Sequence, residues 1–145
     1  MPEEEVRQHV KGISGGDTYG VVAEVHGKII GVVTYQKGLL YPQYQPDGRE
    51  EVEHGYVAEA VVHNEHVGKG IGTILCTEAI AQLTEQYGVN EVYAKRHADN
   101  VPSARMMGKS GMVEIDEYDD PKIRPTGTRR TTVTRYTATN NSQVP

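Results

Sequence analysis

Three glycines in five residues, Gly68, Gly70 and Gly72, form the segment with the clearest potential for chemistry. They lie between an apolar stretch, 55–63, and an amphipathic stretch that extends to about Tyr87. Glycine loses more conformational freedom on folding than any other residue, so the cluster indicates a tight turn or a close approach by another group. A strand-to-helix turn directs free N–H groups and the helix dipole at one spot, which favours a phosphate. A tight turn without a ligand is the alternative.

Two familiar phosphate loops do not fit this segment. The nucleoside triphosphate loop ends in Gly-Lys-[Ser/Thr], whereas Gly68-Lys69 is followed here by Gly70. The dinucleotide fingerprint G-x-G-x-x-G also fails, because its third glycine position holds Leu75 or Thr73, depending on the starting glycine.

The remaining reactive side chains form no evident catalytic group. His63 and His66 are three residues apart, but the spacing reveals no third ligand, so we predict no metal site. Cys76 is the only cysteine and falls inside a predicted helix, where we expect a buried thiol rather than a nucleophile. We expect His54 to be solvated.

Hydrophobic periodicity and turn residues predict the elements that must position the turn. We expect helices at 2–13, from the glycine turn to about 87, and at 102–109, and strands at 18–25, 29–36, 55–63, 90–97, 112–118 and 128–138. In the long helix, Ile71, Leu75, Ala79 and Leu83 share one apolar stripe. The stretch 38–54 is rich in Pro, Gly and polar residues and is predicted to be a loop.

Composition limits the remaining possibilities. The chain has 145 residues, which fits one domain over 1–138 with a polar tail at 139–145. No apolar run approaches the length of a membrane span, and the acidic start differs from a secretory signal. A single cysteine agrees with a reducing compartment, so we expect a cytoplasmic protein without a membrane partner.

Charge argues mildly against a nucleic-acid partner. The net charge is −5, and carboxylates cluster at Asp47, Glu50, Glu51 and Glu53 and again over 114–120. A duplex-binding protein usually has a dominant basic face. The acidic loop favours a cationic substrate, and ordinary solvated surface charge is the alternative.

The glycine turn and the strand before it resemble the acetyl-CoA-binding segment of the GNAT superfamily, the general-control-type N-acetyltransferases. The family pattern is [Arg/Gln]-x-x-Gly-x-[Gly/Ala], after a strand that often carries a Glu among apolar residues. Here the strand contains Ala-Glu-Ala-Val-Val at 58–62, and the pattern's two glycines fall on Gly70 and Gly72. Val67 departs from the pattern, since it stands where Arg or Gln is usual.

A later segment matches the same family in the right order. The family pattern Asn-x-x-[Ala/Ser]-x-x-x-Tyr-x-x-x-Gly-Phe is matched here by Asn100, Ser103 and Gly111. Met107 replaces the Tyr and Met112 replaces the Phe. Two motifs in suitable strand and helix contexts are far more specific than either alone.

The resemblance implies acetyl-CoA as the cosubstrate. It would place the pyrophosphate on main-chain amides of the glycine turn, and the pantetheine arm along the preceding strand like an added strand. The implied binding residues are Ala60, Val62, Val67, Gly68, Lys69, Gly70, Ile71, Gly72, Thr73, Asn100 and Ser103. Asn100 would bond the pantetheine arm and Ser103 would lie near the phosphates, although Asn100 is equally suited to cap a helix before Pro102.

Acetyl transfer to an amine requires removal of a proton from the amine and protonation of the departing thiolate. By resemblance Glu59 is the candidate base, and a strand carboxylate with a structural partner is the alternative. The family's usual acid is the Tyr that is Met107 here, and a thioether cannot donate a proton. Ser110, Tyr93 or solvent would then have to supply it.

The sequence therefore predicts an α/β (α+β) domain of the GNAT type. We expect a mixed, mostly antiparallel sheet flanked by helices, with a short N-terminus that lacks the family's usual first strand and helix. The expected activity is transfer of an acetyl group to a primary amine on a small molecule or peptide. A CoA-binding module with weak or no catalysis is the alternative. The acceptor, the oligomeric state (a homodimer included) and any supply of the missing elements by a partner stay open.

Overall fold

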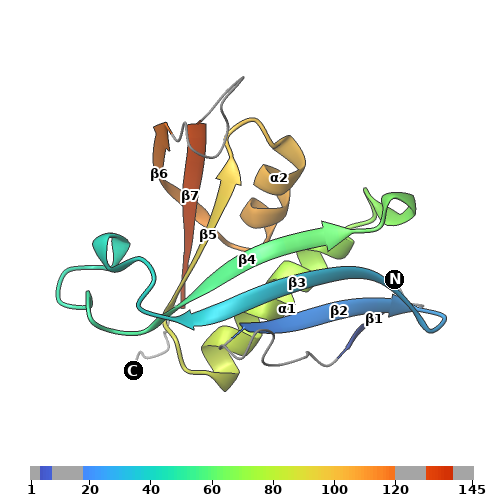
Figure 1. Cartoon of the computed structure of the whole chain (residues 1–145), viewed down its shortest axis with the longest axis horizontal. Helices are drawn as coiled ribbons and strands as arrows, with labels where there is room; N and C mark the ends of the chain where they lie inside the picture. Colours follow the sequence, from blue (N-terminus) through green and yellow to red (C-terminus); the bar gives the residue numbers. More distant parts are fainter. Residues whose placement is uncertain (1–3, 8–17, 120–129, 139–145) are drawn as a thin grey trace.

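A computed structural model describes residues 4–7, 18–119 and 130–138. One mixed sheet carries the strands in the order β1-β2-β3-β4-β5-β7-β6 (Figure 1). Its strands are β1 (Glu4–Arg7), β2 (Thr18–Val25), β3 (Lys28–Gly38), β4 (His54–Val62), β5 (Glu91–His97), β6 (Val113–Asp119) and β7 (Arg130–Thr137). Neighbouring strands are antiparallel except β4 and β5, which are parallel.

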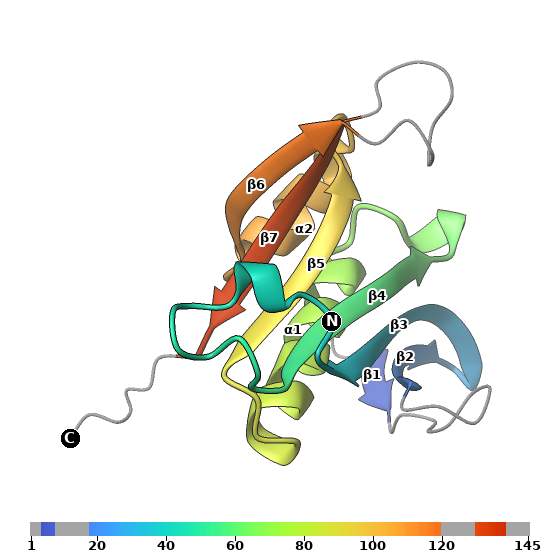
Figure 2. The same cartoon turned by 60° about the vertical axis from the view of Figure 1, so that its left-hand side comes forward.

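Two helices cover one face of this sheet, and a loop covers part of the other (Figure 2). The helices are α1 (Ile71–Ala81), extended by the π-helical turn η4 (Gln82–Gln86), and α2 (Val101–Lys109). Because β4 and β5 are parallel, the chain must cross over between them, and α1 makes this crossover. The loop over 39–53 contains the short helix η2 (Pro42–Tyr44), and a second short helix, η3 (Asn64–His66), follows β4.

The main core lies between α1 and the strands β2, β3 and β4. The predicted stripe of α1 faces inward, since Ile71, Leu75, Ala79 and Leu83 are all buried. Gly88 ends the helix with a φ of +75°, a conformation that glycine adopts at no steric cost. The periodicity argument is therefore confirmed for this helix.

The N-terminal prediction is wrong in the described part of its range. Residues 4–7 form a strand paired with β2, with Val6 opposite Ala23, and not the first turns of a helix. A sheet edge offers a row of unpaired backbone groups, and this pairing outweighs the helical periodicity of a short segment. The domain therefore has an N-terminal edge strand, contrary to our expectation. The remainder of the predicted helix, 2–3 and 8–13, lies outside the described residues.

Candidate functional site

The two parallel strands at the centre of the sheet separate after three residue pairs. Gly55, Tyr56 and Val57 of β4 pair with Val92, Tyr93 and Ala94 of β5, and the ladder ends there. Both strands continue beyond this point, β4 to Val62 and β5 to His97. The second half of β4 therefore presents backbone N–H and C=O groups toward a gap in the sheet, where an extended ligand could pair like an added strand.

A cleft lies at this separation, with about 330 Å³ of free volume when the part open to solvent is included. It is lined by Val57, Ala58, Glu59 and Ala60 of β4, Lys95 of β5, and Ser103, Met106 and Met107 of α2. Of the predicted site residues, the structure thus brings Glu59, Ala60 and Ser103 to one cleft.

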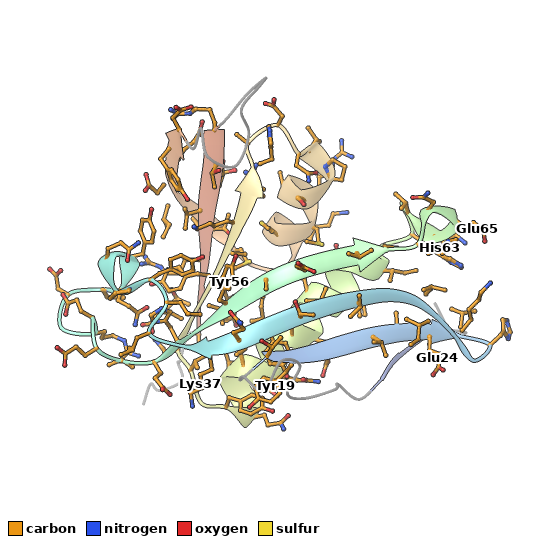
Figure 3. The ribbon with its side chains drawn as sticks, in the orientation of Figure 1. Tyr19, Glu24, Lys37, Tyr56, His63 and Glu65 are labelled. Atoms are coloured by element: carbon orange, nitrogen blue, oxygen red, sulfur yellow. The ribbon has the colours of Figure 1, made fainter. Side chains whose placement is uncertain are left out.

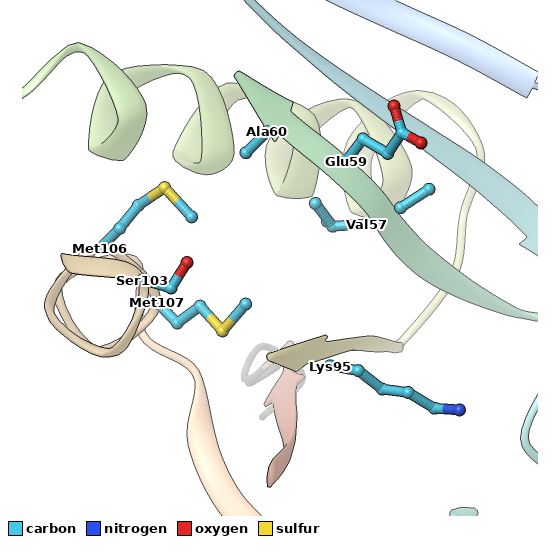
Figure 4. Close-up of a pocket in the computed structure, with 8 residues that line it drawn as sticks. Val57, Glu59, Ala60, Lys95, Ser103, Met106 and Met107 are labelled. Atoms are coloured by element: carbon cyan, nitrogen blue, oxygen red, sulfur yellow. The ribbon is translucent and has the colours of Figure 1, made fainter. Parts of the chain in front are cut away.

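A bulge at Ala58 decides the direction of Glu59. Thr34 of β3 pairs with Glu59, and the next residue, Tyr35, pairs with Val57, so Ala58 is an extra residue in β4. Val57 belongs to the core on the helix side, and strict alternation would send Glu59 to the same side. The bulge shifts the alternation by one residue. Figure 4 shows the result: Ala60 points toward Met106 of α2, and Glu59 leaves β4 on the opposite side.

Glu59 is exposed, and among the described contacts it has no ion pair or side-chain hydrogen bond. The alternative interpretation of Glu59, a carboxylate held by a structural partner, therefore finds no partner in the described part of the chain. An unpaired carboxylate at a cleft edge is available to accept a proton or to bind an ammonium group.

The glycine turn adopts a backbone that other residues would resist. Gly68 and Gly70 have φ values of +89° and +81°, and a Cβ at either position would meet open space. The first helical hydrogen bond of α1 runs from the N–H of Ile74 to the C=O of Gly70 (3.1 Å). The amides before Ile74 consequently have no partner within the helix, and they point out of its N-terminal end. This arrangement suits an anion.

The other predicted binding residues of the turn differ in what they can offer. The Ile71 side chain is buried in the core, so only its main chain can face a ligand. Val67 is exposed at the end of η3, and Lys69 is exposed within the turn itself. Gly72 faces α2, where an added Cβ would lie 3.0 Å from the Met106 sulfur. Gly72 thus permits the close approach of the two helices that flank the cleft.

The second motif spans α2, and its Asn100 and Ser103 lie at the first turn of that helix. The Asn100 side chain accepts a hydrogen bond from the Ser103 N–H (3.0 Å), so it is the N-cap of the helix. This is the structural role that the sequence left open, and Asn100 does not line the cleft. Ser103 does line it, with a half-buried side chain.

Met107 is buried, and it lies at the cleft wall where the family pattern has a Tyr. Its sulfur lies 3.6 Å from the Thr134 hydroxyl of β7. Neither proposed stand-in lines the cleft. The Ser110 hydroxyl donates to the Met106 carbonyl (2.8 Å), and Tyr93 is fully buried with its hydroxyl 2.6 Å from the Gln45 side-chain oxygen. Both hydroxyls are occupied by structural contacts, and burial raises the pKa of Tyr93.

The acidic loop does not line the cleft, contrary to the expectation that it would form an anionic mouth. Glu53 pairs with Lys37 (3.5 Å), and Glu50 accepts a bond from the Gly48 N–H (3.1 Å). Arg49 reaches inward to the buried carboxylate of Glu91 (2.7 Å). Of the four loop carboxylates, Glu50 thus bonds within the loop and Glu53 ties the loop to β3.

The loop instead brings aromatic side chains to the face of the sheet that the helices do not cover, called the open face below. His54 is fully buried rather than solvated, because its Nε2 accepts hydrogen bonds from the N–H groups of Leu40 and Tyr41. The Tyr41 ring packs edge-on against Tyr56 of β4, with 5.2 Å between centroids, and lies 5.7 Å from the ring of Tyr93. Burial, together with Tyr56, raises the pKa of Tyr41, so its hydroxyl stays neutral.

His63 lies just beyond the far end of β4, away from Tyr56 (Figure 3). The short helix η3 that follows contains His66, and the ring centroids of the two histidines are 6.2 Å apart. Among the described residues, no group of three or more His, Cys, Asp or Glu side chains could hold a metal ion. Cys76 is fully buried in α1, and burial raises the pKa of its thiol, which disfavours the reactive thiolate. Within the described part of the chain, no helix is long and apolar enough to cross a membrane.

Sequence reasoning missed two features of this site. The first is Lys95 of β5. Side chains alternate along a strand, so Lys95 lies on the same face as Tyr93, and this alternation can be read from the sequence. The bulge at Ala58 leaves no glycine or other signal in the sequence, and only the pairing of β3 with β4 reveals it.

The family model and the solved structures that match this chain all describe acetyltransferases. A model of the acetyltransferase (GNAT) family matches residues 2–112. A search with the sequence found no match among curated proteins.

Solved structures of acetyltransferases share the fold at low sequence identity. NAA60 of Arabidopsis thaliana, in complex with acetyl-CoA, matches with a TM-score of 0.70 and 17% identity over 87% of this chain and 79% of that chain. The ribosomal-protein-S5-alanine acetyltransferase of Vibrio fischeri matches with a TM-score of 0.67 and 20% identity. The match covers 88% of this chain and 64% of that chain. The F149A mutant of the spermidine N-acetyltransferase of Vibrio cholerae matches with a TM-score of 0.64 and 14% identity. The match covers 85% of this chain and 67% of that chain.

Proposed function

Because the chain belongs to the GNAT acetyltransferase family, we propose that it transfers an acetyl group from acetyl-CoA to a primary amine. The observation that carries the proposal is the separation of β4 from β5 beside the N-terminus of α1. This gives one continuous path: an anion site at the glycine turn, a free strand edge, and a carboxylate at the end of that edge.

The glycine turn is suited to hold the pyrophosphate of the cosubstrate. The main-chain amides of Ile71, Gly72 and Thr73 precede the first bonded amide of α1, and the positive end of the helix dipole lies at the same point. An NAA60 structure in complex with acetyl-CoA supports the choice of cosubstrate.

The second half of β4 is suited to orient the pantetheine arm. Its backbone beyond Val57 has no partner in β5, and Ser103 and Met106 of α2 form the opposite wall. Bound acetyl-CoA supplies the thioester. The main chain near the bulge at Ala58 would hold it in place, with N–H groups available to the carbonyl oxygen.

Glu59 is suited to take the proton from the acceptor amine. It leaves β4 on the side opposite α2, so an acceptor bound at the open face of the sheet would meet the thioester from the side that the pantetheine does not occupy. Among the described residues no tyrosine lines the cleft, so we assign protonation of the thiolate to solvent.

A direct test measures the release of free thiol from acetyl-CoA with a panel of amines: amino acids, polyamines, aminoglycosides and short peptides. Thiol release that depends on an amine, together with the acetylated amine in a mass spectrum, is the expected result. Binding of CoA without transfer to any amine would refute the enzyme proposal. That outcome would favour the second candidate, a CoA-binding module, to which the thioether at Met107 also points.

A further inference from the structure

Lys95 forms the wall of the cleft opposite Glu59, on the open face of β5. Its side chain is half-buried, and its ammonium lies over two tyrosine rings. The Nζ atom is 5.0 Å from the centroid of Tyr41 and 5.8 Å from that of Tyr118. Two rings from separate parts of the chain, the loop and β6, therefore hold one ammonium group beside the cleft, on the sheet face opposite the helices.

This ammonium has no anionic partner among the described residues. Three carboxylates of β6, the edge strand on the far side of β7, are engaged elsewhere: Glu114 pairs with Arg96, Asp116 accepts from the Tyr44 hydroxyl (2.5 Å), and Glu117 pairs with Arg130 (2.9 Å). Glu59 lines the same cleft without reaching Lys95.

Burying part of a lysine side chain costs free energy when its charge has no counter-ion nearby. Contact with aromatic faces offsets part of that cost, and it also holds the long side chain in one place. A cation that is ordered in advance but lacks a counter-ion is suited to an anionic group of a ligand. The two walls of the cleft then carry opposite charges, negative at Glu59 and positive at Lys95.

The direction of the side chain separates this group from the phosphates of the cosubstrate. Figure 4 shows the Lys95 amine pointing away from Ser103 and Met106, toward the face on which Glu59 lies. The anion that it meets therefore belongs to the acceptor side of the cleft.

We propose that Lys95 binds a carboxylate of the acceptor, so that the enzyme acetylates amino carboxylates such as free amino acids. The inference rests on the proposed function. An amine and a carboxylate on one small molecule would match Glu59 and Lys95, whereas a polyamine would bring a second ammonium against Lys95. A peptide N-terminus has no carboxylate beside its amine.

The test compares the common L-amino acids with their α-carboxamides and with polyamines, at equal concentrations of free amine. The wild-type enzyme, Lys95→Gln, Lys95→Arg and the exposed control Lys28→Gln are measured with acetyl-CoA saturating. We expect the acids to be preferred. Lys95→Gln should raise the KM for the best acid about 10- to 100-fold with kcat within about threefold. It should leave the carboxamide unchanged, and Lys95→Arg should restore most of the lost affinity.

Three outcomes would overturn the inference. They are a preference for carboxamides or polyamines, an equal effect of Lys95→Gln on acids and amides, or an equal effect of Lys28→Gln. In each of these the enzyme still transfers acetyl groups, so the proposed function survives. If CoA binds and no amine of any class is acetylated, the proposed function fails as well.

Discussion

Substitution of Gly70 by glutamate tests the anion site most sharply. Gly70 is the N-cap of α1 with a φ of +81°, and nothing lies within 4 Å of an added Cβ. A glutamate is therefore not excluded by crowding. It brings two separable effects, a strained backbone and a negative charge beside the first amides of the helix.

The magnitude of each effect can be worked out. A side chain in the left-handed region costs about 1–2 kcal/mol of folding stability. A carboxylate about 5 Å from one phosphate charge, at an effective dielectric constant of about 20, opposes binding by roughly 3 kcal/mol. Since about 1.4 kcal/mol is tenfold in affinity, Gly70→Glu should weaken CoA binding more than about 100-fold.

Two further variants separate charge from strain. Gly70→Ala carries the strain alone and should change the Kd for CoA less than about tenfold, because about 1–2 kcal/mol of backbone strain acts mainly on folding. Gly27 has a φ of +77° and equally open surroundings in the turn between β2 and β3, so Gly27→Glu is a matched control. It should lower Tm as much as Gly70→Glu does while the Kd for CoA stays at the wild-type value.

Calorimetric titration with CoA measures the affinity, and thermal unfolding followed by circular dichroism measures the stability. If Gly70→Glu folds and binds CoA as tightly as Gly27→Glu does, the glycine turn of α1 does not hold the phosphates. The placement of the cosubstrate along β4 would then lose its anchor.

Three other predictions concern the cleft and its support. Met107→Leu should lower the free energy of unfolding by less than about 1.5 kcal/mol, and it should leave kcat within about threefold of wild type, because a thioether transfers no proton. A loss of kcat by orders of magnitude while CoA still binds would show that Met107 acts in the reaction. Glu59→Gln should lower kcat most at neutral pH and recover partly at high pH, where the free amine is abundant, so wild-type kcat across the pH range would remove the base assignment. Burial opposes ionisation of Glu91, but hydrogen bonds from Arg49, Asn90 and Gln45 outweigh it and lower the pKa of its carboxyl below the ordinary 4.5. This group therefore stabilises the fold fully above about pH 4.5 and loses that contribution as pH falls through its folded-state pKa. Glu91→Gln should accordingly lower the free energy of unfolding by about 2–3 kcal/mol at pH 7 and by less at pH 3, as measured by urea unfolding. An equal loss at both pH values would contradict the role of the charge.

The sheet and its helices could be predicted because their signals are local. Six strands, the helix α1 together with its extension η4, and the helix α2 follow from apolar periodicity bounded by turn residues. Their observed bounds differ from the predicted ones by no more than two residues at each end. The glycine turn was also visible, since three glycines between an apolar strand and an amphipathic helix favour a tight junction with exposed main-chain amides.

The features that failed depend on contacts between distant segments. Residues 4–7 have helical periodicity but pair with β2, and no local pattern announces a sheet edge. The sequence predicts a solvated His54, yet the loop folds back over it, and two backbone N–H groups donate hydrogen bonds to its ring. The direction of Glu59 depends on a single extra residue, Ala58, in the pairing with β3.

The short ladder between β4 and β5 also affects how the molecule would behave when it is free. In the described sheet, three residue pairs tie the antiparallel group β1–β4 to the group β5–β7–β6. The helices on one face, and on the other face the bonds of the 39–53 loop to Glu91, Tyr93 and Asp116, supply the remaining connection. Amides of 58–62 that point into the gap should therefore exchange with deuterium quickly in the free protein. A pantetheine arm paired along them would slow that exchange. It would also make the two groups unfold as one cooperative unit, so the cosubstrate would act as the eighth strand of a seven-stranded sheet.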